Sequence, residues 1–96
     1  MVKTLGSQVK SEVETEPVRA QGNLYEVPEG SRVRVIAIYG GWGARRNLNQ
    51  IGVHVGDVLR VIRRAPVGGP VLVKSHGAEV AIGKRLAGKV TVERVG

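Results

Sequence analysis

The sequence predicts an all-β fold: a small β-barrel of about five strands with one short helix and a short helical turn. Its 96 residues are enough for one small domain. Its apolar residues are rich in Val and include no Phe and one Trp, and the stiff Val side chain suits the pleated surface of a sheet. Short alternating runs are separated by Gly- and Pro-containing turn signals, which is typical of small barrels.

The composition of the chain changes near residue 23. Residues 1–22 mix scattered apolar residues with Gln, Ser, Thr and Glu, and their three basic and three acidic residues cancel. We interpret them as a disordered tail, with a partner-binding arm as the alternative. Residues 23–96 form the predicted barrel domain and carry the whole net charge of +7, twelve Lys or Arg less five Asp or Glu.

The first predicted strand spans residues 31–38, "SRVRVIAI". Its alternation places Arg32 and Arg34 outward and Val33 and Val35 inward, because successive side chains of a strand point to opposite faces.

A short helix is predicted at residues 44–51. Ala44, Leu48 and Ile51 fall on one helical face by their spacing. Gly52 follows at the position where a glycine commonly ends a helix.

Four more strands are predicted after the helix, at residues 57–64, 71–75, 78–82 and 89–95. His76 and Gly77 are expected to form a tight hairpin turn, much as an Asn-Gly pair would. Val80 and Ile82 are expected to face inward. Residues 83–88, "GKRLAG", are predicted to form the short helical turn.

The motifs of common enzymes are missing from the sequence. The run 77–84 resembles a phosphate-binding loop, but five residues separate its glycines and Arg85 follows the lysine where Ser or Thr is needed. The run 41–46 fails as a dinucleotide fingerprint because Arg46 replaces the third glycine. There is no Cys, and no Ser has an evident His and acid partner. The sequence therefore predicts a binding module without catalytic residues.

His54, Asp57 and His76 are weak candidates for metal ligands. His54 and Asp57 lie three residues apart in a predicted loop, and His76 is expected to serve the hairpin turn. Two ordinary surface histidines are the favoured interpretation, so no metal site within one chain is predicted.

The basic charge and the single Trp offer a candidate binding surface. An exposed aromatic beside basic residues could bind single-stranded nucleic acid or an acidic protein, or the charges could simply be solvated. Three aromatic residues are a poor stacking platform, so nucleic acid is not favoured. Trp42 could instead cover the end of the barrel. The candidate partner-binding residues are Trp42, Arg45, Arg46, Arg63, Arg64, Lys84 and Arg85.

The order of motifs resembles the ferrous iron transport protein A (FeoA) family. The resemblance rests on "LYEVPEGSRVRVIAI" (24–38), "GGWGARRNLNQIGVHVGDVLRVIRRAP" (40–66) and "GGPVLVKSHGAEVAIGKRLAGKVTV" (68–92), three segments in the family's order. Val55 departs from the family, which commonly has Pro before this glycine, and the tail has no counterpart in the resemblance.

The resemblance implies an SH3-like barrel that acts as a cytoplasmic accessory protein of bacterial ferrous iron uptake. It would bind the membrane transporter FeoB, which carries a GTP-binding domain, and support or regulate transport without catalysis. It would then meet the membrane only through FeoB, and no cofactor is implied, with Fe²⁺ a weak candidate ligand. The alternatives are a nucleic-acid-binding barrel and a metal-sensing SH3-like module as in iron-dependent repressors.

Overall fold

The computed structural model describes residues 21–96 of the chain. Most of the predicted tail, 1–22, therefore lies outside the described residues. Six strands and two helices follow in the order β3 (Gln21–Asn23), β4 (Arg32–Ile38), α1 (Gly41–Gln50), β5 (Val58–Arg64), β6 (Val71–Ser75), β7 (Ala78–Ile82), α2 (Lys84–Ala87) and β8 (Val90–Arg94). Among these residues, neither helix is long and apolar enough to cross a bilayer.

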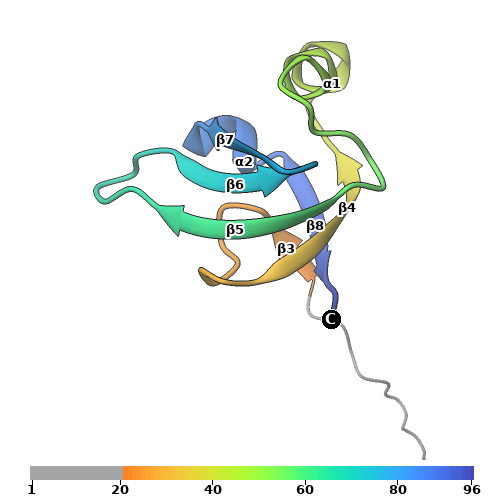
Figure 1. Cartoon of the computed structure of the whole chain (residues 1–96). Helices are drawn as coiled ribbons and strands as arrows, with labels where there is room; N and C mark the ends of the chain where they lie inside the picture. Colours follow the sequence, from red (N-terminus) through yellow and green to blue (C-terminus); the bar gives the residue numbers. More distant parts are fainter. Residues whose placement is uncertain (1–20) are drawn as a thin grey trace, which may run out of the picture.

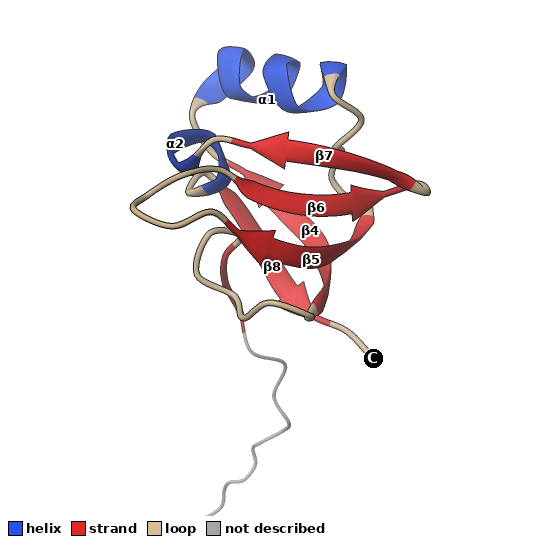
Figure 2. Ribbon diagram, turned by 60° about the vertical axis from the view of Figure 1, so that its left-hand side comes forward, coloured by secondary structure: helices blue, strands red, loops and turns tan. Residues whose placement is uncertain are grey.

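The six described strands form one antiparallel sheet in the order β3-β8-β4-β5-β6-β7. The sheet curls around a single interior, and α1 lies over one end of it while α2 lies beside β7 (Figures 1 and 2). The edge strands β3 and β7 do not pair with each other, so the barrel is closed by side-chain packing. This is the small SH3-like barrel that the sequence predicts, with a sixth strand.

The sixth strand, β3, is not predicted by the sequence. Gln21 and Asn23 pair with Glu93 and Thr91 of β8, so β3 includes two residues that the sequence analysis assigned to the tail. The three residues Gln-Gly-Asn show no apolar alternation. Their strand conformation comes from the free edge of β8 and not from local preference.

Two bulges let the long strands bend around the interior. One interrupts the pairing of β4 with β8 between Val35 and Ala37, and the other interrupts β5 with β6 between Val61 and Arg63. A bulge adds one residue to a strand, bends it and shifts its alternation by one position. The second bulge therefore places Arg64 opposite buried Val71, on the inner face of the sheet, whereas strict alternation would turn it outward.

The interior is filled by aliphatic side chains. Val33 and Val35 are fully buried and Arg32 and Arg34 are exposed, as predicted. Ile82 is buried, and Val80 packs against the core while partly exposed. The buried cluster contains no aromatic side chain; its members are Leu24, Val33, Val35, Leu48, Val53, Leu59, Val61, Val71, Val73, Ile82, Ala87, Val90 and Val92.

The predicted turns are confirmed by the backbone. His76 and Gly77 both have positive φ, 52° and 81°, as a two-residue hairpin turn requires. Gly52 has a φ of 92°. The amide of Gly52 donates to the carbonyl of Asn49, and that of Val53 to Leu48, which together make the Schellman ending of a helix.

Candidate functional site

Helix α1 carries the most exposed aromatic side chain of the described residues. Trp42 is 81% exposed, so it does not cover the barrel end. Arg45 and Arg46 follow it on the solvent side of the same helix. Trp42 and Arg45 both line two hollows, of about 200 and 390 Å³. We call Trp42, Arg45 and Arg46 the α1 surface.

The start of α1 differs from the prediction. The helix begins at Gly41, not at residue 44, so Trp42 lies in its first turn and not in a loop. Gly40, with a φ of 95°, turns the chain out of β4 but provides no side-chain cap. Gly41 and Gly43 are poor helix formers, so little in the local sequence favours this first turn.

Two side chains attach α1 to the barrel. Ala44 and Leu48 are the buried residues of the helix, and Leu48 belongs to the core cluster. Ile51, predicted on the same face, is 39% exposed because the helix ends at Gln50. The α1 surface is thus held by a narrow apolar contact, while the remainder of the helix faces solvent.

Arg64 and Lys84 share an aromatic partner. The Arg64 guanidinium carbon and the Lys84 Nζ lie 5.3 and 5.6 Å from the centre of the Tyr25 ring, within the range of cation–π attraction. Arg64 also donates through Nη2 to the carbonyl of Val27, and the Tyr25 hydroxyl donates to the carbonyl of Gly69 at 3.2 Å. These two basic residues therefore help to hold the 24–27 segment and the β5–β6 loop on the barrel.

The seven candidate partner-binding residues do not form one group. Trp42, Arg45 and Arg46 lie together on α1, and Arg64 and Lys84 pack around Tyr25. Arg63, on β5, and Arg85, on α2, are exposed singly.

The structure brings together the three weak metal candidates, although His76 is 19 residues from Asp57 in the sequence. The Asp57 Oδ2 lies 3.2 Å from the His54 Nδ1, and the Asp57 Oδ1 lies 3.2 Å from the His76 Nε2. The His54 backbone N–H donates to Oδ2 at 2.8 Å. One carboxylate thereby joins the loop after α1 to the β6–β7 hairpin.

The environment of Asp57 favours its charged form. Partial burial by itself would raise the pKa of Asp57, but the hydrogen bonds from the His54 backbone and from the two imidazoles outweigh it. The pKa of Asp57 is therefore held below its ordinary value of 3.8. Among residues 21–96, no three His, Cys, Asp or Glu side chains are arranged to hold a metal ion, so we interpret this cluster as a hydrogen-bonded strut.

The fold is that of a small SH3-like domain, with an exposed tryptophan beside two arginines on α1. Comparison with known proteins shows the family to which it belongs. Residues 22–94 match the family model "FeoA domain". A curated protein of Methanocaldococcus jannaschii, provisionally named Fe(2+) transport protein A, is 42% identical over 65 residues, covering 68% of this chain and 77% of its own. The chain belongs to the FeoA domain family.

Solved structures agree with this placement. A crystal structure of an iron uptake regulatory protein (FeoA) has a TM-score of 0.71 and 33% identity, covering 79% of this chain and 99% of its own. A manganese-dependent transcriptional repressor has a TM-score of 0.73 at 24% identity, covering 82% of this chain and 44% of its own. At that identity the second likeness concerns the fold.

Proposed function

We propose that this protein is an accessory protein of ferrous iron uptake that binds the cytoplasmic GTP-binding part of the transporter FeoB and supports or regulates transport. Membership of the FeoA domain family and the name of the M. jannaschii relative support the link to Fe²⁺ transport. The family is not one of known enzymes, and we expect no enzymatic activity. Fe²⁺ is then the cargo of the transporter and not a resident cofactor of this chain.

The observation that carries the proposal is the α1 surface. The Trp42 indole is 81% exposed on the folded domain, which lowers solubility, and it lies beside two arginines. Trp and Arg are the residues most enriched at the energetic centres of protein interfaces. Two hollows lined by Trp42 and Arg45 offer room for partner side chains next to the ring.

The charge of the domain suits an acidic partner surface. Residues 23–96 carry a net charge of +7, and complementary charge raises association rates and orients the encounter. We place the protein in the cytoplasm, where it reaches the inner face of the membrane through FeoB and not by insertion.

The test is the affinity of the full chain for the GTP-binding domain of FeoB, measured by calorimetry with and without Fe²⁺. We expect Trp42→Ala to weaken binding roughly thirtyfold, the equivalent of ~2 kcal/mol for a central interface residue. The matched control is Val67→Ala, which shortens a fully exposed apolar side chain on the β5–β6 loop and should leave the affinity unchanged.

Two results would contradict the proposal. If the wild-type chain bound FeoB neither with nor without Fe²⁺, FeoB would be excluded as the partner. Equal losses for Trp42→Ala and Val67→Ala would show that binding does not depend on the α1 surface.

A further inference from the structure

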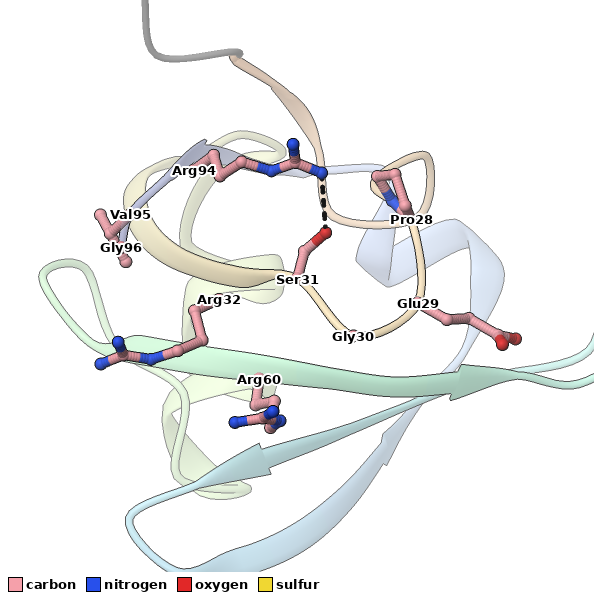
Figure 3. A pocket seen from close by; sticks show the side chains of 9 residues that line it. All are labelled: Pro28, Glu29, Gly30, Ser31, Arg32, Arg60, Arg94, Val95 and Gly96. Carbon is pink, nitrogen blue, oxygen red and sulfur yellow. Dashed lines mark hydrogen bonds between the residues drawn. The ribbon is translucent and has the colours of Figure 1, made fainter.

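A second basic feature lies away from α1, in a hollow of about 460 Å³ at the start of β4 and the end of β8. It is bounded by the 28–31 turn, by residues 95–96 and by Arg32, Arg60 and Arg94. These arginines come from three neighbouring strands, β4, β5 and β8. In Figure 3 the Arg94 side chain points toward Ser31, whereas the side chains of Arg32 and Arg60 lie below Ser31 and point away from it.

The register of the sheet sets two of these charges against each other. Arg32 on β4 and Arg60 on β5 are directly opposite in the antiparallel pairing, and like charges in opposite positions destabilise a sheet. Lys74 of β6 is in turn opposite Arg60. Within residues 21–96 no carboxylate lies within ion-pair distance of Arg32, Arg60 or Arg94, whereas the neighbouring Arg34 pairs with Glu93 at 3.3 Å.

The third arginine is oriented over the hollow. The Arg94 Nη2 donates to the Ser31 Oγ at 3.1 Å, and Ser31 is itself 8% exposed. This bond directs the guanidinium across the turn (Figure 3). Glu29, the acidic side chain of the lining, accepts from the Arg64 backbone N–H at 3.0 Å and points away from Arg94 and Ser31 in the same view.

We propose that this hollow binds a phosphate group. A guanidinium offers a planar fork of donors that matches two oxygens of a phosphate. A phosphate monoester carries about −1.5 to −2 charges near pH 7. It therefore matches the charge of three arginines better than a ligand with a single carboxylate would. A bound phosphate would also relieve the repulsion between Arg32 and Arg60. The site is separate from the α1 surface and does not depend on the binding of FeoB.

The first experiment titrates the full-length, ¹⁵N-labelled chain with sodium phosphate at constant ionic strength. We expect saturable shifts of the amides of residues 30–32, 60 and 94. Arg60→Ala and Arg94→Ala should each raise the dissociation constant by about tenfold or more, because each removes charge-assisted hydrogen bonds. The matched control is Arg85→Ala, which removes the same charge from an exposed position on α2 outside the hollow and should change the constant less than about twofold.

Stability gives an independent measurement. Phosphate bound to the native state should raise the melting temperature of the wild type, by mass action, and raise that of Arg60→Ala less. In the absence of phosphate, Arg60→Ala should melt no lower than the wild type, because it removes a repulsion. Shifts that do not saturate, or an Arg85→Ala variant that binds as weakly as Arg60→Ala, would overturn the proposal and leave only the general attraction of a basic surface for anions.

Vesicles distinguish a soluble phosphate from a lipid headgroup. The chain is sedimented with vesicles of phosphatidylglycerol and phosphatidylcholine. Co-sedimentation that Arg60→Ala loses and Arg85→Ala keeps would support the site and identify the phosphate as that of a lipid. No sedimentation, with saturable binding of sodium phosphate, would support the site for a soluble phosphate. Sedimentation reduced equally in both variants, without saturable phosphate binding, would refute it.

Discussion

The attachment of helix α1 gives the sharpest stability prediction. We expect Leu48→Ala to destabilise the whole domain, because Leu48 is fully buried and α1 has few other means of attachment. The helix has no side-chain cap, no acidic residue in its first turn and no basic residue in its last. Such a short helix is marginal by itself in water, so packing must supply its stability.

The expected cost follows from the burial of Leu48. Truncation of a fully buried Leu to Ala removes about 2–5 kcal/mol, and the better helix propensity of Ala returns only a few tenths. Residues 21–96 are expected to have about 4–11 kcal/mol of total stability. A loss of ~3 kcal/mol should therefore lower the melting temperature by roughly 12–24 °C, at 4–8 °C per kcal/mol for a domain of this size.

Thermal and urea unfolding, followed by circular dichroism, measure this loss. The control is Ile51→Ala, one turn further along and 39% exposed, for which we expect a loss of about 1 kcal/mol. A Leu48→Ala cost within 0.5 kcal/mol of the Ile51→Ala cost would refute the reasoning. Unchanged melting of the barrel, with fast amide exchange confined to α1, would refute the idea that helix and barrel unfold together.

Three further predictions concern other parts of the domain. Hydrogen bonds lower the folded-state pKa of Asp57 below 3.8, so the contribution of Asp57 to stability is present at neutral pH and is lost as pH falls through that lowered pKa. The difference in unfolding free energy between wild type and Asp57→Asn, measured by urea unfolding, should therefore shrink in acid. A difference that grows in acid would contradict this. Val67 has a φ of 57°, which is strained for a β-branched residue, so Val67→Asn should stabilise by about 0.5–1 kcal/mol; a lower melting temperature would count against this. Titration with Zn²⁺ or Fe²⁺ should show no micromolar site in one chain; one equivalent bound tightly and lost in His54→Ala or His76→Ala would disprove it.

Much of the fold could be predicted from alternation and turns. The strands β4 to β8 fall within one or two residues of the predicted runs, because each buries one face and ends at a Gly- or Pro-containing turn. Local patterns failed where tertiary contacts decide the structure. The sequence Gln-Gly-Asn becomes β3 only because β8 offers an edge, and Gly41 begins a helix only because Leu48 docks further along.

The candidate sites were harder to predict. The exposure of Trp42 could not be decided from its neighbours, since flanking glycines suit both a loop and a helix start. The inward turn of Arg64 depends on a bulge, and a bulge has no clear mark in this sequence. Arg32 was predicted to point outward, but nothing in the sequence links it to Arg60 or Arg94, because the pairing of β4 with β5 and β8, not spacing along the chain, brings the three to one hollow. The meeting of His54 and His76 at Asp57 has the same origin.

The aliphatic core and the exposed position of the one tryptophan have a consequence for spectroscopy. With Trp42 already in water and no aromatic ring in the buried cluster, the indole meets nearly the same solvent in the native and the unfolded chain. Its fluorescence should therefore report unfolding poorly. The same emission should shift to shorter wavelength and resist quenching by iodide when a partner covers α1, so the native chain carries a label-free reporter of docking that is nearly silent to denaturation.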